Sequence, residues 1–192
     1  MPKLVSGFTL VEMLIAIGII TALSGVVLFN YGSFNSSLAL TNLAYDIALT
    51  VRQAEYYGIG SKSSEGDFTT GYGVHFDTVQ NTTYNIFSVL KEETSYAFLD
   101  PNQVVQIFDL NNGNYISSIH KINPCEPVSG NVDVVFFRPL PKVYFSYGGT
   151  TELSNGIVVE IKSTRADDKK MYVKILSSGQ IGVSKTSECY PS

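Results

Sequence analysis

An apolar run with a single ionisable side chain is the feature of this sequence that most restricts its fold. From Phe8 to Phe29 there is no Lys, Arg, Asp, His or Pro, and Glu12 is the only charged residue. A helix of about 22 residues rises roughly 33 Å, which is enough to cross a hydrocarbon core of about 30 Å. The run therefore predicts a transmembrane helix over residues 8–29.

The segment before this run, residues 1–7, is polar and carries one positive charge at Lys3. It is too short for a secretory signal peptide, which needs about 15 to 30 residues. A peptidase acting at this junction would have to cut between Gly7 and Phe8 and leave the apolar helix on the mature chain. Because positive charge favours the cytoplasmic side, Lys3 predicts a single-pass cytoplasmic (inner) membrane protein with its N-terminus in the cytoplasm and its globular domain outside.

The junction at the start of the apolar run consists of Lys3, Gly7, Phe8, Thr9, Leu10, Val11 and Glu12. It resembles the junction of the prepilin family, which comprises the type IV pilins and the type II secretion pseudopilins. In that family a membrane peptidase cuts after the glycine and methylates the new amino terminus. The resemblance implies that residues 1–7 are a prepilin leader, that Phe8 becomes the N-methylated first residue, and that Glu12 serves assembly.

The resemblance also implies a set of partners. These are other pilin or pseudopilin subunits, a prepilin peptidase/methyltransferase, an inner-membrane assembly platform and membrane lipid. After assembly, the subunit is expected in an extracellular or periplasmic filament.

The physics of Glu12 leads to the same expectation. An acidic side chain within a membrane span costs a few kcal/mol and usually faces a partner. The α-amine created by cleavage after Gly7, on the same chain or a neighbour, has a reference pKa near 8 and would be such a partner. The alternative is that Glu12, one turn into the helix, reaches the membrane interface and is favoured there by the helix dipole.

The helical pattern continues beyond the apolar run. Between residues 40 and 54 apolar residues recur at i, i+3 and i+4 with polar residues between them. Residues 30–57 are therefore predicted to be an amphipathic continuation of the same helix, resting on a folded domain. A bend or local unwinding is expected at residues 30–37, which are rich in Gly, Ser and Asn. Gly58 and Gly60 predict the helix end, followed by a loop over residues 58–70.

Residues 71–192 alternate with period two and predict an antiparallel β globular domain built from hairpins. With the long helix this gives an α+β, pilin-like fold. The expected strands are Tyr72–Thr78, Thr83–Leu90, Val104–Leu110, Tyr115–Ile122, Val132–Phe137, Val143–Tyr147, Gly156–Lys162, Met171–Leu176 and Gln180–Val183.

A second resemblance rests on residues 43–48, 51–54, 71–76, 137–139 and 178–181. Within the prepilin family, these segments are similar to the H-type minor pseudopilins (GspH/FimT-like). The basic C-terminal motif of some DNA-uptake minor pilins is missing, and the calcium-loop acidic cluster of a major pseudopilin is not evident. The net charge of −4 becomes −4 − 1 = −5 when Lys3 leaves with the leader, which argues against nucleic acid as a partner.

The two cysteines, Cys125 and Cys189, lie in the part predicted to be outside the membrane, where disulfides form. No second Cys or His stands near either one in a metal-binding pattern. A disulfide between them is predicted, and it would tie the chain end to the domain. The alternative is two unpaired buried thiols.

No arrangement of residues in the sequence predicts catalysis, a cofactor or a metal site. His75 and His120 lie in predicted strands and share no metal-ligand spacing, and no nucleophile elbow, P-loop or C-x-x-C motif is present. The function predicted first is a structural subunit of a filament. The alternatives are a minor pilin that binds DNA, a surface or a secreted substrate, and a membrane-anchored enzyme with an unfamiliar site.

Overall fold

The computed structural model describes residues 7–60, 70–90, 96–110, 113–138, 142–165, 169–187 and 189. For residues 27 and 29–33 it describes the backbone only. The leader, apart from Gly7, and most of the loop predicted over residues 58–70 lie outside this part of the chain.

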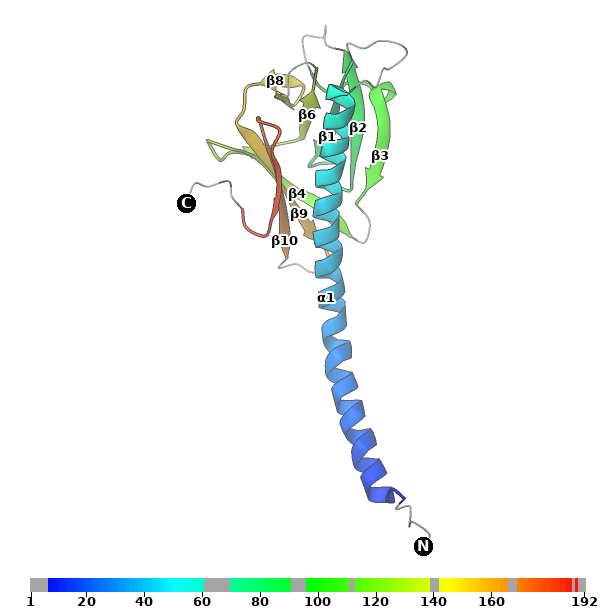
Figure 1. Cartoon of the computed structure of the whole chain (residues 1–192). Coiled ribbons are helices and arrows are strands. Elements are labelled where there is room, and N and C mark those ends of the chain that lie inside the picture. The colour runs from blue at the N-terminus through cyan, green and yellow to red at the C-terminus, as the bar shows by residue number, and fades with distance from the viewer. Residues whose placement is uncertain are drawn as a thin grey trace.

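One helix, α1 (Leu10–Ile59), runs without interruption for 50 residues. The predicted continuation of the helix is therefore present, and the unwinding expected at residues 30–37 is not. The helix ends at Gly60, whose backbone N–H donates to the carbonyl oxygen of Tyr56 over 2.8 Å. Figure 1 shows that the C-terminal half of α1 lies along the β domain while the N-terminal half extends away from it.

The C-terminal half of α1 buries one face against the domain. Its fully buried residues recur every three or four positions, as amphipathic packing requires, whereas Leu49 on the opposite face is 65% exposed. Near the helix end, Gly58 approaches β6 (Asn131–Phe136) so closely that a Cβ there would lie 2.4 Å from the carbonyl oxygen of Phe136. The buried apolar residues of this face are Leu40, Ala44, Ile47, Val51 and Ala54.

The strands form two antiparallel sheets. The 6-stranded sheet has the order β3 (Val104–Asp109), β2 (Thr83–Leu90), β1 (Thr70–Asp77), β6 (Asn131–Phe136), β7 (Val143–Tyr147) and β8 (Thr150–Glu152). The 5-stranded sheet has the order β11 (Ile181–Ser184), β10 (Lys170–Leu176), β9 (Gly156–Ser163), β4 (Asn114–Lys121) and β5 (Pro127–Val128). A 3-10 turn, η1 (Pro101–Gln103), precedes β3.

Each predicted strand is present within two residues of its expected bounds, but the sheets are not simple runs of hairpins. The chain passes from the first sheet to the second after β3, returns after β5 and crosses again after β8. The pairings of β1 with β6 and of β4 with β9 join strands that are far apart in the sequence. The short strands β5 and β8 were not predicted.

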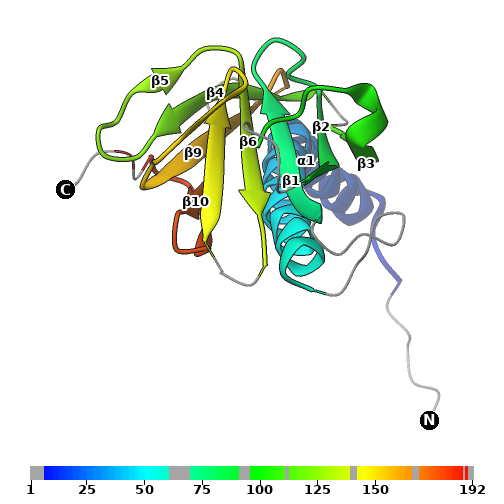
Figure 2. The same cartoon turned by 90° about the horizontal axis from the view of Figure 1, so that it is seen from above.

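The main core lies between α1 and the inner faces of both sheets. Viewed from above, α1 lies against the face formed by β1 and its neighbours (Figure 2), and it also contacts β6, β9, β10 and β11. A second apolar cluster covers the outer face of the first sheet. It consists of Phe87, Val89, Val135 and Phe137, packed under Tyr96, Phe98 and Tyr144.

A third cluster lies on the outer face of the second sheet and contains the disulfide. Cys125 and Cys189 are joined, with 5.5 Å between their Cα atoms. Cys189 is buried together with Val158 and Tyr172. The bridge therefore holds the chain end against β9 and β10.

Replacing both cysteines by serine should lower the free energy of unfolding by about 4 kcal/mol, because the bridge closes a loop of 64 residues in the unfolded chain. Urea unfolding of the detergent-solubilised full chain would measure this change. A reductant should destabilise the wild type by a similar amount and leave the double variant unaffected. Equal stability of the two proteins in the absence of reductant would contradict the prediction.

Ile47→Ala should lower the free energy of unfolding by about 2 to 5 kcal/mol, because it opens a cavity between α1 and the sheets. Leu49→Ala, on the exposed face of the same helix turn, is the matched control and should change stability by less than about 0.5 kcal/mol. Both values come from the same unfolding measurement. A larger loss for Leu49→Ala would show that the buried face has been assigned wrongly.

Candidate functional site

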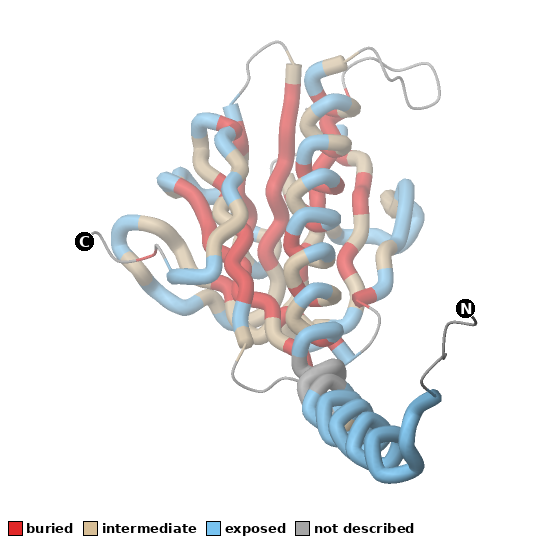
Figure 3. The backbone as a smooth tube through the Cα atoms, turned by 60° about the horizontal axis from the view of Figure 1, so that its bottom comes forward, coloured by how far each residue is buried: buried red, intermediate tan, exposed pale blue. Residues whose placement is uncertain are grey.

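The N-terminal half of α1 presents a large apolar surface that the described part of the chain leaves uncovered. Apart from Gly25, every described side chain of residues 8–28 is exposed, and Figure 3 shows this half as a pale blue rod beneath the buried sheets. Exposed apolar surfaces of this extent mark contacts with membranes or other proteins. The large residues on it are Phe8, Leu10, Val11, Met13, Leu14, Ile15, Ile17, Ile19, Ile20, Leu23, Val26 and Leu28.

A capping box at the start of α1 holds the carboxylate of Glu12. Thr9 is the N-cap, and its hydroxyl oxygen accepts a hydrogen bond from the Glu12 backbone N–H over 3.3 Å. In return, the Thr9 backbone N–H and hydroxyl both donate to Oε2 of Glu12 over 3.5 Å. The carboxylate thus turns back toward the first residues of the chain, where the helix dipole favours a negative charge.

The sequence analysis named Thr9 only as part of the junction that resembles prepilins and did not predict its role as the N-cap of the helix. The signal was present as a threonine followed three positions later by a glutamate, the spacing of a capping box. A carboxylate at this place agrees with both interpretations of Glu12, namely that it pairs with the new α-amine and that it reaches the membrane interface. The assembly role of Glu12 stays a prediction.

The predicted cleavage point lies just outside the helix. Phe8 is 82% exposed, and no atom of the described residues lies within 4 Å of the place where a Cβ of Gly7 would stand. Cleavage there, and N-methylation of Phe8, stay predictions.

His75 has a buried carboxylate partner that the sequence did not indicate. It faces Asp133 on the neighbouring strand, with 2.6 Å between Nδ1 and Oδ1, and the Phe98 backbone N–H donates to Oδ2 over 3.2 Å. Asp133 is fully buried, and this desolvation raises the pKa of its carboxyl. The two residues are 58 positions apart, so no local pattern connects them.

The arrangement around His75 holds a loop against the first sheet. The imidazole packs against the ring of Phe98 with 4.7 Å between centroids, so the pair fastens residues 96–98 onto the outer face of the first sheet. His120 lies apart on β4. Among the described residues, no group of three His, Cys, Asp or Glu side chains is placed to hold a metal ion.

The comparison with protein families concerns the N-terminus. Residues 2–28 match the model of the prokaryotic N-terminal methylation motif. The chain has a prepilin-type N-terminus. The resemblance to prepilins is thereby confirmed, and the motif supports a pilin-like subunit.

Among solved structures, the chain is similar to the minor pseudopilin EpsH from the type 2 secretion system of Vibrio cholerae. The two share 11% sequence identity with a TM-score of 0.44, over 78% of this chain and 98% of that chain. A comparison with curated proteins gave no match. Within the described residues, no helical stretch meets both the length and the hydropathy needed to cross a membrane, so the transmembrane helix predicted over residues 8–29 is not confirmed.

Asp133→Asn should lower the free energy of unfolding by about 1 to 3 kcal/mol near pH 7, because the ionised carboxylate accepts at both oxygens, from His75 and from the Phe98 N–H, whereas an amide has one acceptor oxygen. Asp109→Asn, at an exposed position of β3, is the control and should have little effect. Urea unfolding of each variant measures the change.

The pH dependence of this effect has a defined sign. Because burial raises the pKa of Asp133, the folded chain keeps this proton to a higher pH than the unfolded chain, whose aspartate titrates near 3.9. The wild type therefore loses stability at this residue as the pH rises from about 4 through the folded-state pKa, while asparagine does not titrate. The difference in the free energy of unfolding between the wild type and Asp133→Asn should therefore become smaller as the pH rises over that range. A difference that widens would mean that the ionised form is favoured in the folded state.

Proposed function

We propose that the protein is a structural subunit, a minor pseudopilin, of a type II secretion or type IV pilus-type filament. The observation that carries the proposal is the exposed apolar half of α1 with a single carboxylate held at its start. In this proposal residues 8–29 store the subunit in the cytoplasmic membrane, with its N-terminus in the cytoplasm and the domain outside. The protein acts by assembly and has no catalytic role.

Processing changes the charge next to Glu12. Cleavage between Gly7 and Phe8 replaces a neutral amide by an amine that is mostly protonated at neutral pH. That amine belongs to the residue preceding Thr9, whose own N–H already lies 3.5 Å from the carboxylate. The attraction between the new amine and Glu12, within one subunit or between neighbours, is the interaction that we propose aligns subunits as they leave the membrane.

Packing of the apolar halves then stabilises the filament. Once the subunits leave the lipid, the apolar residues of α1 are buried against the same residues of neighbouring helices, which removes them from water. The prepilin peptidase/methyltransferase and the inner-membrane assembly platform are the further partners in this scheme. The β domain, fixed to the other half of α1, decorates the filament or its tip.

Two substitutions of Glu12 separate the assembly role from the capping role. Glu12→Gln keeps an acceptor at the third helical position and so preserves the capping box, but removes the negative charge. Glu12→Ala removes both. If the charge aligns subunits, both variants should be cleaved after Gly7, yet be recovered in sheared filaments at less than about a tenth of the wild-type level, as expected for loss of one member of a buried ion pair.

The measurement combines mass spectrometry of the N-terminus with quantification of the subunit in sheared filaments, in cells that hold the assembly system. Glu55→Gln, on the distant half of α1, is the control and should assemble normally. If Glu12→Gln is recovered in sheared filaments at the wild-type level, the role of Glu12 is limited to capping the helix. An intact, unmethylated Met1 on the native protein would overturn the proposed function itself.

A further inference from the structure

The half of α1 that packs on the β domain carries a second surface, which faces away from the core. Of residues 38–59, eight are exposed, and seven of these recur at alternating intervals of four and three residues. Five of the seven are large and apolar, with exposed fractions between 37% and 74%. We call the seven residues the outer stripe: Leu38, Asn42, Tyr45, Leu49, Arg52, Tyr56 and Ile59.

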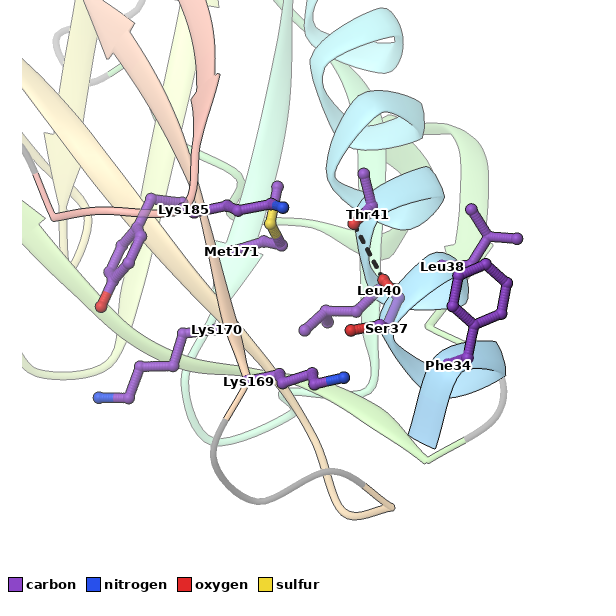
Figure 4. Close-up of a pocket in the computed structure, with 10 residues that line it drawn as sticks. Phe34, Ser37, Leu38, Leu40, Thr41, Lys169, Lys170, Met171 and Lys185 are labelled. Atoms are coloured by element: carbon purple, nitrogen blue, oxygen red, sulfur yellow. Dashed lines mark hydrogen bonds between the residues drawn. The ribbon is translucent and has the colours of Figure 1, made fainter. Parts of the chain in front are cut away.

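The outer stripe lies on the side of α1 opposite the sheets. The buried residues of the helix, among them Ala44 and Ile47, follow the same intervals but are shifted by two positions. A shift of two residues turns about 200° around an α-helix, so the two sets are on opposite sides. Where the stripe begins, the side chain of Leu38 extends away from β10, whereas that of Leu40 extends toward it (Figure 4).

The composition of the outer stripe is unusual for a surface that faces water. A helix that rests on a domain by one face normally presents polar residues on the other face. Here Asn42 and Arg52 are the polar members of the stripe, and the remaining members are aliphatic or tyrosine. Contiguous exposed apolar side chains mark contacts with another protein, and tyrosine is enriched at such contacts. The stripe therefore has the character of an interface.

The spacing of the outer stripe indicates the kind of partner. Alternating intervals of four and three residues are those of a coiled-coil seam, in which positions a and d of a seven-residue repeat face a second helix. A single Asn at an a position favours a parallel two-stranded pair and fixes its register, because each Asn then meets its own copy. In this repeat position a is occupied by Asn42, Leu49 and Tyr56, and position d by Leu38, Tyr45, Arg52 and Ile59.

Arg52 is the one charged residue of the outer stripe, and in such a pair it would lie opposite its own copy. Its Nη1 donates to Oε2 of Glu55 over 2.6 Å and to the carbonyl oxygen of Gly179 over 3.0 Å. Because Gly179 lies in the turn between β10 and β11, the guanidinium is drawn toward the domain, and Glu55 balances its charge. The aliphatic part of the side chain remains available to the stripe.

The size of the outer stripe suits a contact that forms within a membrane-bound population. Its seven residues expose roughly 700 Å², in the lower part of the range of about 600 to 1,000 Å² per partner for specific interfaces. Confinement of the apolar halves to one membrane would raise the local concentration of stripes and align the helices in parallel. Since the buried face is opposite the stripe, the two β domains would lie on the outside of the pair.

We propose that two copies of this chain pair in parallel through the outer stripes of α1 while they are stored in the membrane. The parallel orientation rests on the proposed storage of residues 8–29 in the membrane with the N-terminus in the cytoplasm. Pairing removes the apolar side chains of both stripes from water. In the dilute detergent solution of the unfolding measurements the copies are separate, so Leu49→Ala reports there on the single chain.

Disulfide cross-linking tests the pairing in membranes of cells that produce this chain without the assembly system. Helix axes about 8 to 10 Å apart bring identical seam residues within the Cα separation of about 4.4 to 6.8 Å that a disulfide needs. Cys125 and Cys189 are bonded to each other, so an introduced cysteine supplies the free thiol. Leu49→Cys and Tyr56→Cys should each give a covalent dimer on mild oxidation.

Val79→Cys is the control for random collision, because Val79 is 80% exposed and lies outside the helix. It should give at least about tenfold less dimer, since nothing holds its two copies at disulfide distance. Equal yields at Val79→Cys and Tyr56→Cys would overturn the proposal.

The two helix reporters together determine the direction of the pair. In a parallel pair both positions meet their own copies. In an antiparallel pair centred on Leu49, the two copies of Tyr56 would be about 21 Å apart along the axis. Cross-linking of Leu49→Cys alone would therefore indicate an antiparallel contact and overturn the parallel pair.

A charge in the seam tests whether the outer stripe itself holds the pair. Leu49→Lys, added to the Tyr56→Cys reporter, would bury two unpaired charges and should reduce the cross-linked fraction about tenfold or more. Val79→Lys makes the same change of charge at an exposed position outside the helix and should leave the fraction unchanged. Equal fractions in the two lysine variants would overturn the seam.

The remaining outcomes distinguish other partners and the fate of the proposed function. A Tyr56→Cys product that forms only beside other pilin-like subunits, with a mass different from two copies, would assign the stripe to a different subunit and overturn self-pairing. Absence of cross-links at both positions, with Glu12-dependent assembly intact, would overturn this inference alone. Cross-linked pairs of a chain that keeps an intact Met1 and never enters filaments, in cells that hold the assembly system, would leave the pairing standing and remove the filament function.

Discussion

The burial of one face of α1 against both sheets is the constraint on which the rest of the structure depends. Each sheet has an inner apolar face, and the helix covers the two faces together in one core. That face needs apolar residues at every third or fourth position, and the close approach of the helix end to β6 needs a glycine at residue 58. Since the buried face fixes the axis of the helix, it also fixes the direction in which the apolar half leaves the domain.

The helix and most strands could be predicted from the sequence, but the assignment of the strands to two separate sheets could not. Helical and period-two patterns are local, and they located α1 and the longer strands closely. The pairing of β1 with β6 is non-local, and β1 is buried on both faces. Gly71 and Gly73 broke the alternation there because the rings of Phe137 and Phe87 occupy the space beside them. The cover of that outer face comes from residues 96–98, which have no periodic signal.

The candidate site shows the same division between local and distant signals. Gly7, Phe8 and Glu12 could be proposed from the sequence because the whole motif lies within a few residues. The spacing of Thr9 and Glu12 would have predicted the capping box as well. The pairing of Asp133 with His75 could not be proposed in this way, since it joins side chains from separate strands. The fold determines which side chain lies beside a titratable group. The partner of His75, Asp133, could therefore be identified only after the register of β1 and β6 was known.

The uninterrupted course of α1 determines how forces pass through the molecule. With no break between its apolar half and its core-bound half, the helix makes the domain and the rod one lever about 75 Å long. In the proposed filament, a rotation or translation of the packed helices would be transmitted to the β domains, because α1 is continuous from Leu10 to Ile59. The angle between neighbouring β domains on the outside of the filament would then depend on how the helices pack at its centre. A small change in the tilt of a helix would displace its β domain by a larger distance, because the helix is long.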